Sequence, residues 1–307
     1  MIRRNIYTIG ETVLDIIFKN NQPIAAKPGG SMLNTSVSLG RLGIPVHFVT
    51  EFGTDKPGNI ISGFLNINNV NTRYSSLYNE GKTAIAMAFL NEKNDASYEF
   101  YKQYPEKRLN IEIPTFKKDD ILIFGSFFAM TPEIRGVLLK ILDFAKKNNT
   151  LIIYDPNFRK SHLHELDDLK PAIEENFSYA DIIRGSNEDF EYIYNAPDVD
   201  SAFTKINKPE KILIYTKSST GVIIKAKSFK LEYSVPQITP VSTIGAGDTF
   251  NAGIIYGLLK NDITSDKLSS VSDELWKDVT NLAVGFAQNT CMSLDNYISK
   301  EFSQKYK

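Results

Sequence analysis

The sequence is poor in the residues that build disulfides and metal centres. Its 307 residues include one Cys, three His and one Trp. Cys291 has no second cysteine to pair with, and the histidines at positions 47, 162 and 164 do not have the spacing of a zinc site. Acid–base chemistry in this chain is therefore expected to come mostly from its 36 Asp and Glu side chains.

Charge and hydropathy exclude further classes of protein. The 35 Lys and Arg side chains nearly balance the acidic ones, giving a formal charge of −1, whereas a nucleic-acid partner requires an excess of basic groups. No window approaches 18 consecutive apolar residues, and the N-terminus lacks the hydrophobic stretch of a signal peptide. We expect a soluble cytoplasmic protein that binds neither nucleic acid nor membrane.

Strand and helix patterns alternate along most of the chain. Alternation of this kind predicts an α/β fold with a mostly parallel sheet. Short β-branched runs predict buried strands at 6–10, 46–50, 121–125, 151–155, 181–184, 212–216 and 222–225. Amphipathic stretches predict helices at 31–42, 57–67, 132–147, 167–176, 187–194, 245–260 and 274–291.

Two segments interrupt this alternation with hairpin patterns. In 12–27 an apolar run is followed by a polar turn and a second short run, and 83–104 repeats the arrangement around the turn at 91–95. Hairpins without a crossover helix do not fit inside a parallel sheet. They predict either a small β-layer that projects as a lid or edge strands added to the main sheet.

The strongest local feature is the glycine-rich stretch 242–253, which precedes a long apolar helical pattern. Gly245 and Gly247 flank Ala246, and Asp248 follows in the first helical turn. Small residues and free amides at a helix N-terminus favour an anion site, although an Asp in a first turn also simply stabilises the helix. The third glycine of a dinucleotide fingerprint is absent, as is the Gly-Lys-Ser/Thr of a P-loop.

This stretch resembles the second signature of the ribokinase-like (PfkB) carbohydrate kinases, usually written D-T-x-G-A-G-D. Residues 28–36 with 40–43 resemble the first signature, and five further matches lie in family order. These matches are at 10–15, 51–58, 155–159, 187–188 and 216–221. The resemblance covers the whole chain and is greatest to the fructokinase branch.

The resemblance implies a three-layer α/β fold with a mostly parallel central sheet and a small β-sheet lid. Residues 1–307 would form one sugar-kinase domain, with lid segments at about 12–27 and 83–104. It also implies ATP- and Mg²⁺-dependent phosphorylation of a small sugar. Asp248 would be the general base, and the amides of Gly245, Ala246 and Gly247 would stabilise charge on the transferred phosphoryl group.

The family match places sugar binding in the first half of the chain and assigns it to Asp15, Gly29, Gly30, Asn34 and Arg159. Local patterns leave alternatives open. Strand alternation could point Asp15 at water, the Gly29–Gly30 pair could be a turn before a helix cap, and Arg159 could be a solvated loop residue. A carboxylate in an apolar strand and an amide that both donates and accepts nevertheless suit sugar hydroxyls.

The nucleotide-binding residues implied by the family are Asn187, Thr216, Ser218, Gly221 and Asn289. Mg²⁺ would be held largely through water and phosphate oxygens, with Glu188 as a water-mediated contact.

Three departures from the family pattern are visible. Ser242 replaces the usual Asp of the second signature and puts a monovalent-cation site in question. The acid of the Asn-x-x-Glu pattern is displaced near Asn187, so Glu188, Glu191 or water alone would support the metal. Ser218 stands where many members have Gly, which predicts a different backbone turn near the ribose.

The sugar itself is less determined than the family. The segments around Thr83 and Tyr98 favour fructose, whereas Lys102, Lys107 and Arg108 keep the carboxylate substrate 2-keto-3-deoxygluconate open. Ribokinase is less favoured, and nucleoside kinases of the same fold remain possible. A catalytically inactive sugar-binding regulator is a different class, which the intact stretch 245–248 disfavours. An apolar lid face also predicts a homodimer that forms through the lid.

Overall fold

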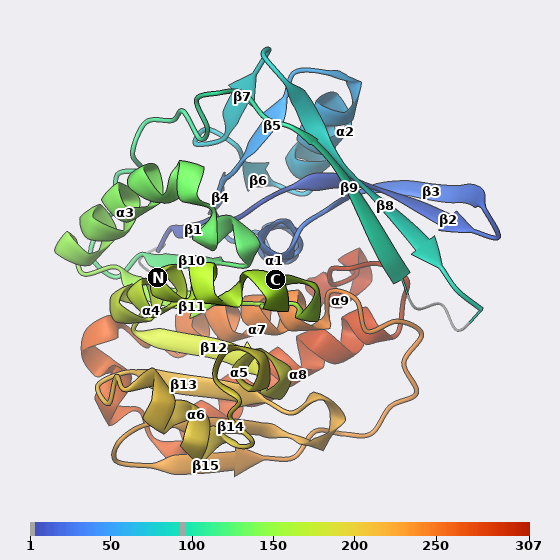
Figure 1. Ribbon diagram of the computed structural model, residues 1–307. Helices are drawn as coiled ribbons and strands as arrows, with labels where there is room; N and C mark the ends of the chain where they lie inside the picture. Colours follow the sequence, from blue (N-terminus) through green and yellow to red (C-terminus); the bar gives the residue numbers. More distant parts are fainter. Residues whose placement is uncertain (1–3, 93–95) are drawn as a thin grey trace.

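The computed structural model describes residues 4–92 and 96–307. Within them, nine strands form one sheet in the order β15-β14-β13-β12-β11-β10-β1-β4-β6 (Figure 1). The strands are β1 (Ile6–Ile9), β4 (Val46–Val49), β6 (Val70–Asn71), β10 (Ile121–Gly125), β11 (Leu151–Asp155), β12 (Ile182–Ser186), β13 (Ile212–Thr216), β14 (Val222–Lys225) and β15 (Lys230–Tyr233).

All pairs from β6 to β13 are parallel, and only the edge strands β14 and β15 pair antiparallel within this sheet of the described chain. The parallel strands are buried on both faces, which explains their continuous apolar runs. Each predicted strand is confirmed. Their carboxyl ends share one edge of the sheet, so residues 155, 186 and 216 lie near one another.

Helices cover both faces of this sheet. Every predicted helix is confirmed, with ends displaced by at most three residues. The helices are α1 (Ser31–Arg41), α2 (Lys56–Ile67), α3 (Pro132–Lys147), α4 (Leu166–Tyr179), α5 (Asn187–Tyr194), α6 (Val199–Ile206), α7 (Ala246–Lys260), α8 (Asp273–Cys291) and α9 (Lys300–Gln304).

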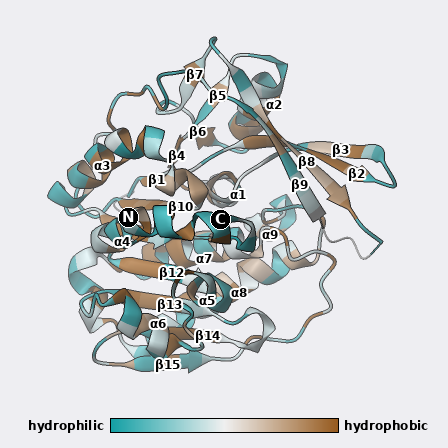
Figure 2. Cartoon of the chain, viewed as in Figure 1, coloured by the Kyte–Doolittle hydropathy of each residue, from teal (hydrophilic) through white to brown (hydrophobic). Residues whose placement is uncertain are grey.

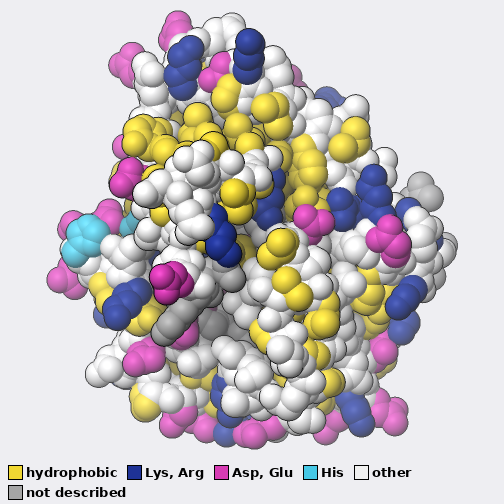
Figure 3. Space-filling view, turned by 90° about the vertical axis from the view of Figure 1, so that its right-hand side faces the viewer, with side chains coloured by type: hydrophobic (Ala, Val, Ile, Leu, Met, Phe, Trp, Pro, Cys, Tyr) yellow, Lys and Arg dark blue, Asp and Glu magenta, His cyan; other side chains and the backbone are white. Residues whose placement is uncertain are grey.

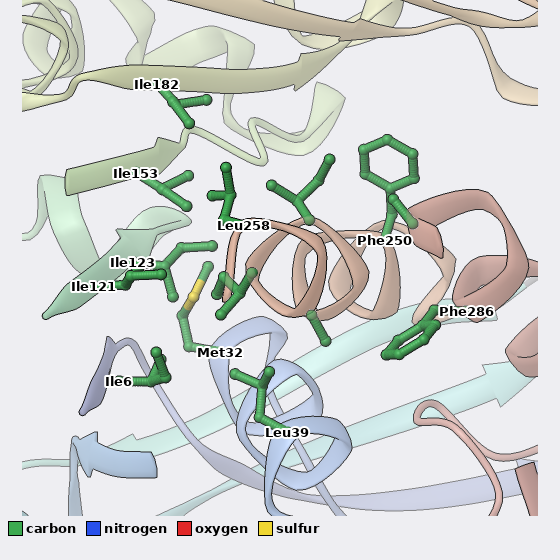
Figure 4. Close-up of a cluster of buried hydrophobic side chains, with 14 of the residues drawn as sticks. Ile6, Met32, Leu39, Ile121, Ile123, Ile153, Ile182, Phe250, Leu258 and Phe286 are labelled. Carbon is green, nitrogen blue, oxygen red and sulfur yellow. The ribbon is translucent and has the colours of Figure 1, made fainter. Parts of the chain in front are cut away.

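Two large apolar cores lie on the two sides of the sheet. One packs α1, α7 and α8 against side chains such as Ile6 and Ile123, and the close-up in Figure 4 shows these side chains pointing toward the helices. The other packs α3 to α6 against the opposite face. Figure 2 shows the brown, apolar strands lying between helices whose outer surfaces are largely teal. The predicted three layers are therefore present.

A second, four-stranded sheet projects from the main body (right in Figure 1). Its strands are β2 (Val13–Lys19), β3 (Gln22–Gly29), β8 (Lys82–Leu90) and β9 (Ala96–Gln103), in the order β3-β2-β8-β9. Both predicted hairpins are present, and β2 pairs parallel with β8 to join them. The lid prediction is confirmed, and the alternative of edge strands on the main sheet is wrong. A short sheet of β5 (Glu51–Gly53) and β7 (Ser76–Tyr78) lies beside the lid.

No helix in the described ranges is long and apolar enough to cross a membrane.

Candidate active site

The first turn of α7 holds a partly buried carboxylate, Asp248. Asn34 of α1 donates an Nδ2 hydrogen bond to Asp248 Oδ2 at 2.8 Å, and Thr35 Oγ1 donates to the Asp248 carbonyl at 2.9 Å. Burial raises the pKa of Asp248, while the Asn34 hydrogen bond opposes that rise. The side chain is thus held in a fixed position by α1, in an environment that makes it a better proton acceptor than a solvated aspartate.

Gly245 sets the entry into this helix. It is the residue before the first turn, with φ +80°, and a Cβ there would lie 2.3 Å from the Asn296 carbonyl oxygen. Only glycine tolerates both the left-handed backbone and this approach. The Ala246 amide donates to the Thr243 carbonyl at 3.2 Å, so an anion at this turn would be met mainly by the other first-turn amides.

The carboxyl ends of three parallel strands meet in a buried polar network. Arg184 of β12 pairs with Asp155 of β11, Nη1 to Oδ2, at 2.9 Å, and its Nη2 donates to Thr216 Oγ1 of β13 at 3.2 Å. Asn251 of α7 donates to the same Asp155 oxygen at 2.6 Å. A Cβ on Gly247 would lie 3.2 Å from Arg184 Nη1, so a guanidinium charge adjoins the glycine turn.

Several buried polar atoms around this network lack a protein partner. Within the described residues they include Asn34 Oδ1, Asn251 Oδ1 and Arg184 Nε. Buried polar groups are normally hydrogen-bonded, and unpaired ones grouped near a helix N-terminus are typical of a ligand site.

The segment after β12 begins α5 with a capping box between Ser186 and Asp189. The buried Asp189 carboxylate also accepts from the Phe158 amide at 2.6 Å, while Glu188 is exposed. Burial, reinforced by the charge of Asp155, raises the pKa of Asp189. Asn187, the first residue of α5, is partly exposed and precedes both of these acids.

On the lid, Asp15 faces inward from β2. Its β3 neighbour in the register is Lys27, and a Cβ on Gly29 would lie 1.9 Å from Asp15 Oδ2, so the carboxylate occupies the space that glycine leaves. Gly30 has φ +128° and packs against the Glu11 carbonyl. Burial raises the pKa of Asp15 to about 7, and the charge of Lys27 opposes the rise. The strand does not turn this carboxylate toward bulk water.

Two aromatic side chains share the inner lid face with Asp15. The register places Phe100 on the row of Asp15, and Tyr98 stacks on Phe100 with ring centroids 6.0 Å apart. Burial and the charge of Asp15 raise the pKa of Tyr98, whereas Arg159 lowers it; the charge of Arg159 also opposes the burial shift at Asp248. Arg159 therefore lies within electrostatic reach of both the lid and the helix α7 carboxylate, although its own side chain is exposed.

Two of the basic residues at the base of the lid, Lys102 and Arg108, are paired with acids, whereas Lys107 is exposed. Lys102 Nζ lies 2.8 Å from Glu11 Oε1, and Tyr104 donates to the same carboxylate. Arg108 forms a buried ion pair with Glu51 and stacks over the Tyr104 ring at 3.4 Å.

The loop after β13 contains the next group of predicted residues. Thr216 is buried and bound to Arg184, while Ser218 has φ +47° and Gly221 has φ +151°. Ser218 takes the left-handed conformation for which glycine is favoured. The replacement of glycine by serine therefore puts a strained residue into this loop. Asn289 accepts from the Ser299 amide at 2.9 Å, which ties the end of α8 to the chain before α9.

This geometry combines the Asp248 carboxylate, a helix N-terminus and a lid with inward-facing polar and aromatic groups. The family model described as pfkB family carbohydrate kinase matches residues 3–288. The chain belongs to the pfkB family of carbohydrate kinases. Its ribokinase-like fold therefore serves an ATP-dependent phosphotransferase.

Individual relatives agree with this assignment. The fructokinase of Rhizobium leguminosarum bv. trifolii is 27% identical over 278 residues, which cover 88% of this chain and 84% of that protein. The fructokinase of Vibrio cholerae O395, solved in a fructose-, ADP- and calcium-bound form, aligns with a TM-score of 0.83 at 18% identity, covering 99% of each chain.

The fold alone does not select the sugar. Aminoimidazole riboside kinase from Salmonella enterica aligns equally well, with a TM-score of 0.83 at 17% identity over 98% of this chain and 99% of that one.

The site residues predicted for this pfkB kinase fall into two groups in the structure. Asp248, Asn34 and the glycine turn are brought together at the start of α7, and the charge of Arg159 reaches Asp248. Arg159 and Asp15 both act on Tyr98 of the lid. Asn289 lies at the opposite end of α8 from its first turn and is engaged by Ser299. Glu188 remains on the surface.

Three polar residues of the site were missed by sequence reasoning: Arg184, Asn251 and Asp189. Arg184 is the third of the five residues of β12 and follows two isoleucines, so it carries the same signal that singled out Asp15, a charged residue inside an apolar strand. Asn251 and Asp189 gave no local signal, because a helical Asn and a first-turn Asp are ordinary residues at such positions.

Proposed function

We propose that this kinase transfers the γ-phosphoryl group of ATP to a primary hydroxyl of fructose. The single observation that supports the reaction most directly is the partly buried Asp248 carboxylate, held by Asn34 beside the glycine turn. Asp248 removes the proton of the hydroxyl as its oxygen bonds to the γ-phosphorus. The bond from that phosphorus to the bridging oxygen breaks, and ADP leaves.

The glycine turn and Arg184 supply positive potential where negative charge accumulates. The first-turn amides at Gly245 and Gly247, together with the guanidinium beside Gly247, would face the transferred group. Asp155 and Asn251 hold that guanidinium in place from two directions. Asn187, Thr216, Ser218 and Gly221 would contact the nucleotide, and Asn289 would lie near its base.

The charge arrangement of the lid supports a neutral sugar. Lys102 is neutralised by Glu11 and Arg108 by Glu51, so neither is available to a substrate carboxylate. Asp15 on the inner lid face would instead repel such a group and accept hydroxyls. Tyr98 and Phe100 offer apolar ring faces to the sugar. These features favour fructose over 2-keto-3-deoxygluconate.

Mg²⁺ fits the site as an ion held through water and nucleotide phosphates. The nearby carboxylates of Asp155 and Asp189 are already engaged by Arg184, Asn251, Ser186 and the Phe158 amide. The described residues contain no cluster of three His, Cys, Asp or Glu side chains suited to a metal. When bound, the ion would offset phosphate charge, and Glu188 would contact its waters.

An ADP-release assay across fructose, 2-keto-3-deoxygluconate, ribose, tagatose and adenosine tests the proposal. We expect the highest kcat/KM with fructose and dependence on both ATP and Mg²⁺. A higher kcat/KM with 2-keto-3-deoxygluconate would overturn the substrate assignment. Absence of turnover on every acceptor would favour a regulatory sugar-binding protein.

We further propose that residues 1–307 act as one domain that dimerises through the lid, in the cytoplasm where ATP is supplied. The outer lid face includes Ile16, Phe18, Met87, Phe89 and Tyr101 as well as the carboxylate of Glu99, and the Phe18 and Phe89 rings stack at 5.0 Å. Tyr101 is 56% exposed. Figure 3 shows hydrophobic side chains gathered over the upper part of the side on which the lid projects. A second copy would cover this face.

A further inference from the structure

Lys27 connects the lid to a distant part of the chain. It lies on β3 opposite Asp15 of β2. Its Nζ donates to the Leu294 carbonyl at 2.6 Å, across 267 residues of sequence. Lys27 is partly buried, and burial lowers its pKa while the charges of Asp295 and Asp15 oppose that shift. One ammonium group thus adjoins the proposed sugar ligand and a backbone carbonyl outside the lid.

The carbonyl belongs to residues 292–298, which we call the C-terminal segment. This segment is fixed to α1. Arg41 donates to the Ile298 carbonyl at 2.6 Å and lies over the Tyr297 ring at 4.4 Å. The Ile298 amide donates to Ser38 Oγ at 3.3 Å. The Leu294 carbonyl that accepts from Lys27 therefore belongs to a segment that contacts with α1 hold in place.

The same segment contacts the glycine turn. The Asn296 carbonyl lies so close to Gly245 that a Cβ there would be 2.3 Å away. Only Asp295 lies between Leu294 and Asn296. Helix α1, which holds the segment, also presents Asn34 to Asp248. The hydrogen bond from Lys27 to Leu294 is thus connected, through the C-terminal segment and α1, to both the Gly245 turn and Asp248.

We propose that Lys27 is a positioning residue that latches the lid onto the C-terminal segment and so couples lid closure over the sugar to the geometry of the Gly245 turn. The latch rests on the kinase reaction proposed above but not on the identity of the sugar. With the latch formed, Asp15 is held over the acceptor site while the first turn of α7 keeps its place. Without it, each half of the site can still form, but the two are no longer held together.

Kinetics of Lys27→Met give the first test. Methionine keeps the length of the side chain and removes the ammonium donor. We expect kcat/KM to fall about tenfold for the sugar and also for ATP, although Lys27 lies on the lid. Lys27→Arg should restore most of the loss because it can donate to the same carbonyl. Lys19→Met, at the far end of β2, serves as the matched charge control and should stay within twofold of the wild type.

Hydrogen exchange gives a readout that does not depend on turnover. In the substrate-free enzyme, Lys27→Met should accelerate amide exchange in β3 and in residues 292–296, with exchange in α3 unchanged. An effect transmitted only through the charge of Asp15 would disappear in an Asp15→Asn background. The latch predicts that the acceleration at 292–296 persists there.

Unchanged exchange at 292–296 in Lys27→Met, or a loss confined to the KM of the sugar, would overturn the latch. A wild-type enzyme that turns over none of the tested sugars would overturn the proposed function alone, because the exchange experiment requires no sugar.

Discussion

At the scale of single residues, two partly buried aspartates lie in different environments. Asp248 is held by an amide donor at a helix N-terminus, whereas Asp15 lies in a sheet with Lys27 as its nearest counter-charge. Burial raises the pKa of both. The surroundings therefore suit one to proton abstraction and the other to accepting hydroxyls.

Replacing the proposed base tests its role directly. Asp248→Asn keeps the size of the side chain but removes its ability to accept a proton. We expect kcat to fall by about 10²–10⁴-fold, with sugar binding measured by calorimetry and the circular dichroism spectrum largely preserved. A variant with near-normal kcat would disprove the assignment of Asp248 as base.

Sugar binding should depend on pH through Asp15. Because its pKa is raised to about 7, the carboxylate that accepts hydroxyls is progressively lost as the pH falls below 7. We expect the Kd of the sugar to rise between pH 8 and pH 5. Asp15→Asn should bind more weakly and lose this pH dependence. A wild-type Kd that stays constant over this range would contradict the assignment.

The same pKa affects folding stability with the opposite sign. A carboxyl group that binds its proton more tightly when folded favours the folded state at acid pH, and this contribution is lost as the pH rises from about 4 through 7. Asp15→Asn should therefore raise Tm more at pH 8 than at pH 5, as measured by thermal melts at both pH values. An equal change in Tm at the two pH values would argue against a buried, titrating Asp15.

At the scale of elements, the site depends on how closely α7 packs against α8. Gly253 of α7 faces the α8 backbone, and a Cβ there would lie 2.4 Å from Ala283 Cα. Because the neighbour is backbone, neither helix can relax locally. The helix that presents Asp248 is thus positioned by a backbone contact one and a half turns further along.

A pair of alanine substitutions tests this packing. Gly253→Ala should lower the free energy of unfolding by about 1–3 kcal/mol. Gly285→Ala, in α8 with open space at its Cβ position, should raise it by about 0.5–1 kcal/mol through helix propensity. Urea denaturation of both variants measures the difference. Similar effects from the two changes would show that close approach is not what glycine provides at 253.

The elements that sequence patterns missed are short or lie at edges. Helix α6 spans Val199–Ile206, and strands β5, β6 and β7 have two or three residues each. The three strands are too short for an alternating period to repeat, so tertiary pairing decides their conformation. Edge strand β15 alternates exposed and half-buried residues and carries too little apolar signal to predict.

At the scale of the whole molecule, the outer lid face accounts for the proposed dimer. Light scattering should give a mass near twice the 34.6 kDa of one chain. Tyr101→Lys places a charge in that face and should shift the equilibrium toward the monomer. Phe144→Lys, at a 48% exposed aromatic on α3, is the control and should not. A wild-type protein that remains monomeric at high concentration would overturn the proposal.

The amino-acid sequence by itself determined the α/β alternation, the two hairpins, the family and the residues Asp248, Asp15 and Asn34. These follow from periodicities and motifs that are local in the chain. Only the tertiary structure decided that β2 pairs with β8 and that Arg184 joins Asp155 beside the glycine turn. It also decided that Lys27 meets Leu294. Each of these contacts joins segments that are far apart in the sequence. Such pairings depend on how the layers of the fold pack together, and no local sequence pattern contains that information.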